Sequence, residues 1–182
     1  MSATSYAEAC VAWALRHLGD PYVWAGQGEW AVRRDAQGQG QIVSAGELGC
    51  PGMGFDCAGL VKRAHFAAAG TGAVDLRSWW SASDLFWHLP EAREGDLRLV
   101  FYGQGDVASH IEFDLGNRLR LGANGGDSTT LTYMHALHRN AKVRIGFEGR
   151  GDRIGFRSLD ALRNLPLHPP PRPTTLPAPR TP

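Results

Sequence analysis

Apolar positions near the start of the chain repeat at the spacing of a helix. Ser5 and Glu8 form a capping-box pattern, in which each side chain accepts a hydrogen bond from the backbone N–H group of the other residue. Apolar residues then recur at intervals of three and four over residues 7–18, and Gly19 interrupts the pattern. We therefore predict a first helix that ends at Gly19 and buries Cys10 on its apolar side.

Two further helices and a run of strands follow in the sequence. Residues 57–69 have an apolar face and stop at Gly70, which predicts a helix, and residues 81–88 predict a shorter one. Alternating apolar and polar residues predict strands at 97–102, 110–115, 119–123 and 142–147. Helices that precede a run of antiparallel strands are typical of an α+β fold. We expect the N-terminal helices to pack on a small antiparallel sheet.

The strand at 110–115 alternates strictly, and this alternation fixes how it pairs with the next strand. Its two faces carry Ile111, Phe113 and Leu115 on one side and His110, Glu112 and Asp114 on the other. Matching the apolar faces pairs Phe113 with Leu121 and leaves a three-residue loop at 116–118. In this register three pairs share the polar face: Asp114 with Arg120, Glu112 with Gly122, and His110 with Asn124.

Two segments lack any clear periodicity. Residues 25–56 are rich in glycine and predict a long surface excursion before the second helix. Residues 166–182 contain most of the eleven prolines of the chain and predict an extended, flexible tail. We therefore expect one domain over residues 1–165, with the glycine-rich segment as an insertion in it, followed by the tail.

The composition is that of an ordinary globular protein, with 43% hydrophobic and 20% charged residues among 182. The net charge of +1 gives no reason to expect a nucleic-acid partner, and no apolar run is long enough to span a membrane. The three cysteines leave at least one thiol free and leave a Cys10–Cys50 disulfide open. His135 and His138 lack the further ligands of a zinc site, so we expect no metal and no cofactor.

Cys57 begins the predicted second helix, in a position that suits a nucleophile. The partial positive charge and free N–H groups of a helix start favour a thiolate and stabilise an oxyanion. His110, at the start of a strand, is the candidate general base. A catalytic imidazole needs a third group that fixes its orientation. Two residues are candidates for this role, Asn124 from across the hairpin and Glu112 from two positions along the same face.

Four segments, in order, resemble the NlpC/P60 family of papain-like cysteine peptidases, which cleave the peptide stems of bacterial cell walls. They are residues 18–26 (LGDPYVWAG), which resemble Gly-x-Pro-Tyr-x-Trp-Gly-Gly; residues 55–61 (FDCAGLV), which resemble Asp-Cys-Ser-Gly-Leu-Val; residues 94–102 (EGDLRLVFY), which resemble Pro-Gly-Asp-Leu-Val-Phe-Phe; and residues 109–117 (SHIEFDLGN), which resemble His-Val-Gly-Ile-Tyr-Leu-Gly. The resemblance covers roughly residues 5–125. It implies a papain-like α+β fold with Cys57 as nucleophile and His110 as base.

The resemblance also implies substrate contacts and reveals departures from the family pattern. Tyr22 matches the tyrosine beside the nucleophile that helps to bind substrate or oxyanion, and Asp56 matches the acidic residue that shapes substrate binding. Glu112 stands where glycine is usual, and we count it with Tyr22 and Asp56 as a candidate for substrate binding. The family's third polar residue often lies twelve positions after the histidine, which is Gly122 here. The orienting role therefore passes to Asn124, to Glu112, or to a backbone group or water.

These expectations describe a cysteine peptidase that hydrolyses an amide bond in peptidoglycan stem peptides through a Cys57 thioester. Ala58 replaces the family's usual serine, which leaves the specificity open. Two alternatives stay open: a papain-like amidase or transferase that acts on another substrate, and a catalytically inactive relative that binds the cell wall.

Two further expectations concern sugar contacts and location. Trp79 or Trp80 is a candidate for stacking on a sugar in the cleft. No classical signal peptide begins the sequence. For a protein that acts on the cell wall we therefore expect a phage lysin or tail component, or an effector exported by a dedicated route, and otherwise a cytoplasmic protein.

Overall fold

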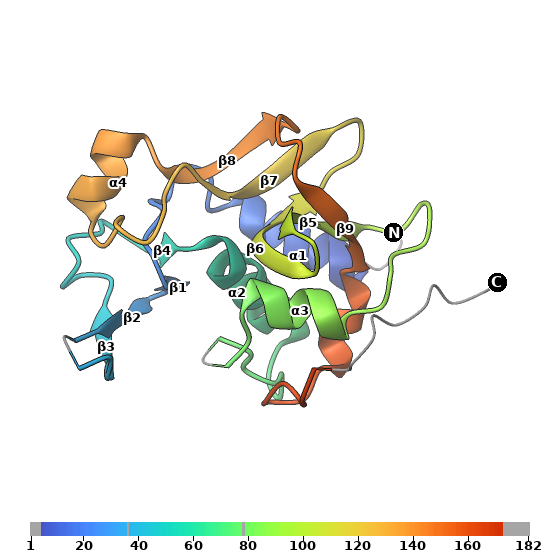
Figure 1. Ribbon diagram of the computed structural model, residues 1–182, viewed down its shortest axis with the longest axis horizontal. Helices are drawn as coiled ribbons and strands as arrows, with labels where there is room; N and C mark the ends of the chain where they lie inside the picture. Colours follow the sequence, from blue (N-terminus) through green and yellow to red (C-terminus); the bar gives the residue numbers. More distant parts are fainter. Residues whose placement is uncertain (1–4, 36, 78, 173–182) are drawn as a thin grey trace.

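A five-stranded antiparallel sheet forms the centre of the molecule (Figure 1). The computed structural model describes residues 5–35, 37–77 and 79–172. The strands lie in the order β8-β7-β6-β5-β9. Their bounds are β5 Arg98–Gln104, β6 Val107–Asp114, β7 Leu119–Asn124, β8 Lys142–Phe147 and β9 Arg153–Ser158. The four predicted strands are confirmed with small differences at their ends, and β9 adds an edge strand that we did not predict.

Three helices share a hydrophobic core with this sheet. They are α1 (Tyr6–Leu15), α2 (Cys57–Ala69) and α3 (Ala82–His88). Helix α1 packs along α2, and both α2 and α3 contact β6. The core includes Leu60 of α2, Phe101 of β5 and Phe113 of β6, which are completely excluded from solvent. The arrangement confirms the expected α+β fold.

The first helix begins as predicted but ends earlier. Both hydrogen bonds of the capping box between Ser5 and Glu8 are present. Cys10 is completely buried, as expected. The helix nevertheless ends at Leu15 rather than at Gly19, since Leu15 and Leu18 are both exposed and the apolar stripe has nothing to pack against beyond this point.

The second helix matches the prediction at both ends. Asp56 caps α2 at its start and Gly70 follows its last residue. Gly70 has a φ of +73°, a left-handed value that glycine adopts without strain. Helix α3 begins after Ser81, whose hydroxyl accepts a hydrogen bond from the N–H group of Asp84. These local capping interactions explain why both helices were predictable.

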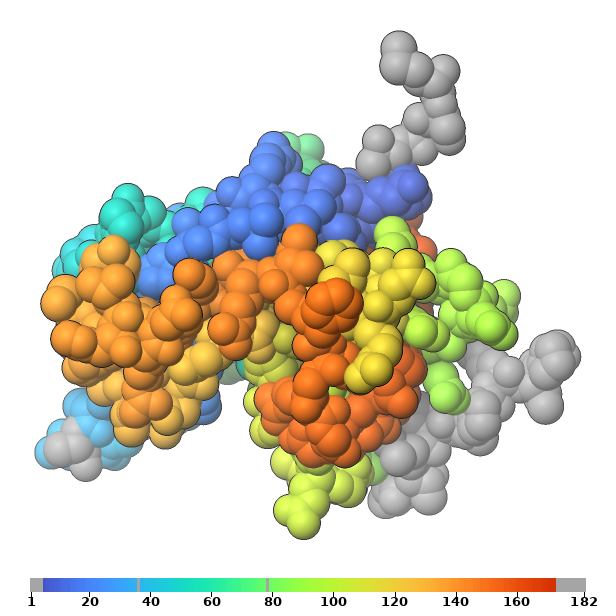
Figure 2. Space-filling model, turned by 90° about the horizontal axis from the view of Figure 1, so that it is seen from above, coloured from blue at the N-terminus to red at the C-terminus, as the bar shows by residue number. Residues whose placement is uncertain are grey.

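The glycine-rich excursion is not only surface structure, and the prediction was wrong in this respect. It contains four short strands: β1 Gln27–Gly28, β2 Trp30–Arg34, β3 Gly40–Ser44 and β4 Gly54–Phe55. Ala31 of β2 pairs with Val43 of β3, and both are buried in a second small core with Leu48 and Cys50. Tyr133, the first residue of α4 (Tyr133–Arg139), packs on this core. The excursion and α4 therefore form one end of the molecule, on the left in Figures 1 and 2.

The segment after the sheet runs back along the domain. It contains a short 3-10 helix, η1 (Asp160–Asn164), and then the start of the proline-rich tail. The indole N–H of Trp80 donates to the Pro166 carbonyl at 3.0 Å, and Arg172 pairs with Asp84 at 3.1 Å. Residues 173–182 of the predicted flexible tail lie outside the described residues.

Two findings bear on the remaining expectations from composition. Cys10, Cys50 and Cys57 are all free thiols, so the disulfide that was left open does not form. Over residues 5–172, apart from positions 36 and 78, no helix has the length and apolar character needed to cross a membrane.

Candidate active site

The candidate nucleophile Cys57 is the first residue of α2, and the start of this helix packs closely against the segment that leads into β1. Asp56 caps the helix, and its carboxylate accepts a hydrogen bond from Gly59 N–H at 2.5 Å. The Asp56 N–H group donates to the Gly26 carbonyl at 3.0 Å. A Cβ atom at position 59 would stand 1.8 Å from that oxygen, so only glycine permits this approach. The local sequence therefore fixes Cys57 at a helix N-terminus, with 8% of its surface exposed.

His110 reaches the nucleophile from β6. The residue is buried, with 8% of its surface exposed, and its ring interacts with both Cys57 and Glu112. Burial lowers the pKa of the imidazole, but the interactions with Cys57 and Glu112 outweigh burial and raise the pKa to about 9. His110 is therefore protonated at neutral pH, and an adjacent imidazolium favours the thiolate form of a cysteine.

Glu112 is the acidic group closest to the imidazole. Its Oε1 atom lies 3.4 Å from His110 Nε2, within ion-pair range but outside hydrogen-bond geometry. The same Oε1 atom accepts a hydrogen bond from Asn124 Nδ2 at 2.6 Å. Burial raises the pKa of the Glu112 carboxyl group, but the charge of His110 and the hydrogen bond from Asn124 outweigh burial and lower it. Glu112 is thus a buried carboxylate beside the imidazole.

Gly122 provides the space that the Glu112 side chain fills. A Cβ atom at position 122 would stand 2.8 Å from Glu112 Cγ and 3.2 Å from Asn124 Nδ2. Any larger residue there would displace the carboxylate from the imidazole. The position where the family resemblance expects a polar residue therefore holds a glycine that makes room for an acid from the neighbouring strand.

The hairpin register is confirmed where the strands pair. Phe113 lies opposite Leu121, and Asp114 lies opposite Arg120. Asn124 comes from the predicted strand, but its amide contacts Glu112 rather than His110. The structure therefore brings both proposed third residues into the site, with Glu112 next to the histidine and Asn124 behind Glu112.

Tyr22 packs beside the nucleophile as a buried ring. It lies between the strand that contains Phe55 and the backbone of Gly126, where a Cβ atom would stand 2.0 Å from the ring. Burial raises the pKa of the Tyr22 hydroxyl, and the nearby Cys57 and Asp56 raise it further. Its hydroxyl makes no hydrogen bond to any other residue that the structure describes. A protonated hydroxyl in this position is available to donate to a substrate oxygen.

Sequence reasoning missed Lys62, a buried cation one turn into α2 from Asp56. Its ammonium group donates to the backbone carbonyls of Trp80 at 2.7 Å and Arg77 at 3.1 Å. Burial lowers the pKa of Lys62 and raises the pKa of Asp56, even though their opposite charges favour ionisation of both. A lysine inside the helix pattern gave no signal of this burial, because exposed lysines are common in helices.

A groove of about 620 Å³ adjoins Asp56. Its lining includes the exposed side chains of Trp24, which precedes α2 in the sequence, and Trp79, which follows it. Trp80 also touches the groove, but it is 1% exposed and its indole N–H is bonded to the chain after η1. Of the two tryptophans proposed to stack on a sugar, only Trp79 therefore presents its ring to solvent.

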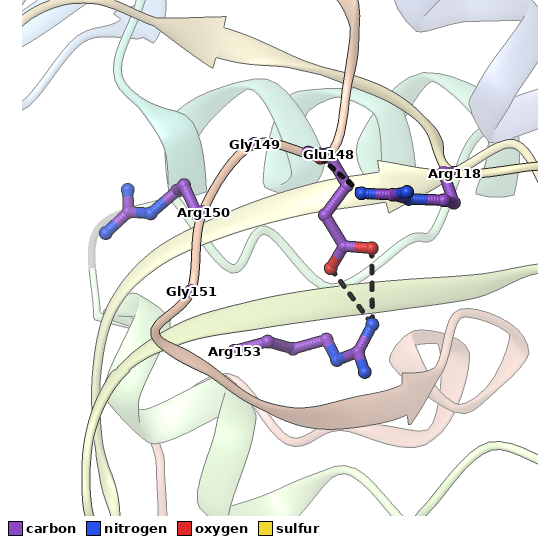
Figure 3. A pocket seen from close by; sticks show the side chains of 6 residues that line it. All are labelled: Arg118, Glu148, Gly149, Arg150, Gly151 and Arg153. Atoms are coloured by element: carbon purple, nitrogen blue, oxygen red, sulfur yellow. Dashed lines mark hydrogen bonds and ion pairs between the residues drawn. The ribbon is translucent and has the colours of Figure 1, made fainter.

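A network of buried charges lies beside Glu112 on the sheet. Arg120 pairs with Asp114 and with Glu148, the latter at 2.9 Å. Glu148 lies in the turn between β8 and β9. Figure 3 shows its side chain pointing toward Arg153, the first residue of β9, while Arg150 projects away from both. The hollow drawn there contains none of the predicted site residues, so we place the chemistry at Cys57 instead.

Tyr102 is a second residue that sequence reasoning missed. It lies directly opposite His110 in the pairing of β5 with β6, and the ring centroids are 5.9 Å apart. With Glu112, Arg120 and Asn124 it lines a cavity of about 350 Å³. Matching the apolar faces of these two strands would have placed Tyr102 beside the histidine.

Comparison with known proteins gives relatives that act on peptidoglycan. No family model matches the chain. The chain is 36% identical over 110 residues to the peptidoglycan endopeptidase RipB of Mycobacterium tuberculosis, which corresponds to 59% of this chain. It spans only 39% of that relative's length.

Three solved structures share the fold. The peptidoglycan hydrolase RipB of M. tuberculosis has 24% identity and a TM-score of 0.51, over 84% of this chain and 63% of that one. The P60 domain of an antigen from M. avium subspecies paratuberculosis has 24% identity and a TM-score of 0.50, over 84% and 93%. RipD of M. tuberculosis, described as a non-catalytic protein adapted to peptidoglycan binding, has 20% identity and a TM-score of 0.54, over 85% and 96%.

Proposed function

We propose that this chain is a member of the NlpC/P60 family, which its 36% identity to RipB over 110 residues and the shared fold support. We propose that it is a cysteine peptidase that hydrolyses an amide bond in the stem peptides of peptidoglycan. The observation that carries the proposal is the placement of Cys57 at a helix start, beside a buried His110 whose Nε2 atom lies 3.4 Å from Glu112.

In the first half of the reaction Cys57 forms a thioester. The thiolate attacks the carbonyl carbon, and the backbone N–H groups at the start of α2, with the hydroxyl of Tyr22, stabilise the oxyanion. The His110 imidazolium then donates its proton to the amide nitrogen, and the carbon–nitrogen bond breaks. The amine leaves, and the acyl group stays on Cys57.

In the second half water hydrolyses the thioester. His110, now neutral, takes a proton from the water molecule as its oxygen adds to the carbonyl carbon. The carbon–sulfur bond breaks, which releases the carboxylic acid and restores the thiolate. Throughout, Glu112 holds the imidazole ring and stabilises its positive charge, and Asn124 holds the Glu112 carboxylate in place.

A peptidoglycan-binding module without activity is the second candidate, because RipD has the same fold and is described as non-catalytic. The fold alone therefore does not decide between hydrolysis and binding. The intact arrangement of Cys57, His110 and Glu112 favours hydrolysis. The route by which the protein reaches the cell wall, phage-encoded or exported, stays a prediction.

The test compares Cys57→Ala with a matched thiol variant, Cys50→Ala. Cys50 is equally shielded from solvent but lies in the second core, away from the histidine. We expect purified peptidoglycan to release new amino groups with the wild-type protein and with Cys50→Ala, and none with Cys57→Ala. Iodoacetamide should label Cys57 at neutral pH and label it far more slowly in His110→Ala. Release of amines by Cys57→Ala would refute the proposed nucleophile, and binding to peptidoglycan without any release by the wild type would favour the binding module.

A further inference from the structure

The groove beside Asp56 has the features of a ligand site in addition to those of the catalytic centre. Its volume of about 620 Å³ is in the range of small-molecule sites. Two indole rings line it with large exposed areas, 45% for Trp24 and 55% for Trp79. Flat aromatic faces rimmed by polar groups are surfaces on which the C–H faces of a pyranose ring stack.

The excursion before α2 builds much of this groove. Strand β2 contributes Val32, Arg33 and Arg34, and the chain before β1 contributes Trp24 and Ala25. The excursion pairs with the chain that leads into α2, since Gln27 of β1 lies opposite Phe55 of β4. The groove is therefore continuous with the segment that carries Cys57.

Gln27 adds an unused hydrogen-bonding group to the groove. Its side chain lines the groove, is only 5% exposed, and has an Oε1 atom without a partner among residues 5–35, 37–77 and 79–172. Leaving a buried acceptor unpaired costs about 1–3 kcal/mol. The oxygen itself is covered, so a ligand that donates an N–H or O–H group, such as a sugar hydroxyl or an acetamido group, would reach it once the amide turns toward the groove.

The charges of the groove disfavour a positively charged ligand. Arg33 and Arg34 are exposed on its wall and Lys62 is buried at its base. Arg77 also lines it, but it is already paired with Asp75 and Glu29. The one acid of the lining, Asp56, already accepts the hydrogen bond that caps α2, and burial raises the pKa of its carboxyl group. The lining therefore carries four cationic side chains against one carboxylate, a balance that disfavours a free ammonium group.

We propose that this groove binds the saccharide of peptidoglycan, and that the substrate is a stem peptide whose amino end is still joined to the glycan. In peptidoglycan the sugar is attached through an amide at the amino end of the stem, so the groove takes the amino side of the bond that is cut. A stem peptide with a free amine would place an ammonium group near Arg33 and Arg34 and leave both tryptophans uncovered. The inference rests on the proposed function, because it names the form of stem peptide that the same site accepts.

The experiment compares three forms of one stem peptide: the free amine, the N-acetyl peptide, and the peptide joined to the disaccharide. We expect kcat/KM to be at least about tenfold higher for the disaccharide form than for the N-acetyl form, and lowest for the free amine. Trp24→Ala and Trp79→Ala should each reduce the tenfold preference for the disaccharide form over the N-acetyl form to about twofold. Arg33→Glu should raise cleavage of the free amine selectively.

Two control variants lie outside the groove. Met134→Ala removes an exposed apolar side chain from α4, and Arg93→Glu reverses an exposed charge between α3 and β5. Neither should change the order of the three substrates. Equal cleavage of all three forms, or preference for the free amine, would overturn the saccharide site while leaving the peptidase intact. Absence of cleavage of every form would overturn the proposed function.

A binding measurement keeps the saccharide site testable apart from catalysis. Calorimetry with the Cys57→Ala protein should show tighter binding of the disaccharide-linked peptide than of the free peptide. Adding Trp24→Ala to that protein should remove the difference. Equal affinities of Cys57→Ala for the two ligands would refute the site whether or not the wild type cleaves.

Discussion

Replacing Glu112 with glutamine removes one negative charge from the base of the proposed site and leaves its shape unchanged. The carboxylate lies 3.4 Å from His110 Nε2 and is fixed by Asn124. Glutamine can still contact both neighbours, so the substitution isolates the effect of the charge. The imidazolium form of His110 loses its partner, while the neutral form is barely affected.

The structure allows the size of this effect to be worked out. A unit charge at 3.4 Å interacts with the imidazolium by at most about 5 kcal/mol at an effective dielectric constant of about 20. Desolvation of the two buried groups offsets part of this attraction, and we take about 1.5–3 kcal/mol, the range of charge-assisted contacts, as the net interaction. Loss of this interaction lowers the pKa of His110 from about 9 in the wild type to about 7–8 in Glu112→Gln.

The pH profile of kcat/KM on a stem peptide measures this change. The reactive form needs the His110 imidazolium, so activity falls as the pH rises through the pKa of that group. We expect the alkaline limb of the profile to lie near pH 9 in the wild type and to move to about pH 7–8 in Glu112→Gln. Glu94→Gln, a change of an exposed acid, should leave the profile unmoved. An alkaline limb that stays at the same pH in Glu112→Gln would refute the role given to Glu112.

Three further predictions follow from the same packing. Gly122→Ala places a Cβ atom 2.8 Å from Glu112 Cγ and should lower kcat/KM at least about tenfold. The double variant Glu112→Gly with Gly122→Glu moves the acid to the neighbouring strand and should be more active than Glu112→Gly alone. Equal activities of these two variants would contradict the idea that an acid at either position can serve the histidine. Arg120→Met leaves Asp114 and Glu148 with fewer partners and should cost about 3 kcal/mol in urea unfolding, against little change for the exposed Arg118→Met. The pKa of His110 is raised from 6.5 to about 9 in the folded protein. The protonated imidazole therefore stabilises the fold fully below pH 6.5, and this contribution is lost as the pH rises through 9. The difference in unfolding free energy between wild type and His110→Ala should fall by about 3 kcal/mol over that interval, and a constant difference would refute the raised pKa.

The elements that local interactions define were predictable from the sequence. The capping box at Ser5, the cap at Asp56 and the glycine after Ala69 each specify a helix end within a few residues. Strand β9 escaped prediction because it has only two apolar residues, Ile154 and Phe156, which are separated by glycine and flanked by arginines, and only its pairing with β5 makes it a strand. The core of the excursion was hidden for the same reason, since Ala31 and Val43 come together only through the hairpin.

In the candidate site, too, the features set by local sequence were predictable and those set by distant contacts were not. Cys57 and His110 were proposed from a helix start, a strand face and the family resemblance, and the structure places them near each other. The choice between Glu112 and Asn124 required the positions of side chains, because both residues lie on the correct face. Lys62 and Gln27 gave no signal at all, since their burial depends on segments far away in the sequence.

The contact between Glu112 and position 122 also restricts the order in which this site can have changed over time. An acid at position 122 and an acid at position 112 would compete for one volume, since even a methyl group at 122 stands 2.8 Å from Glu112 Cγ. A lineage that moves the acid from one strand to the other therefore passes through a protein with no acid at either position, or changes both residues together. A survey of relatives that looks for the third polar residue only twelve positions after the histidine would overlook a carboxylate that reaches the imidazole from the histidine's own strand.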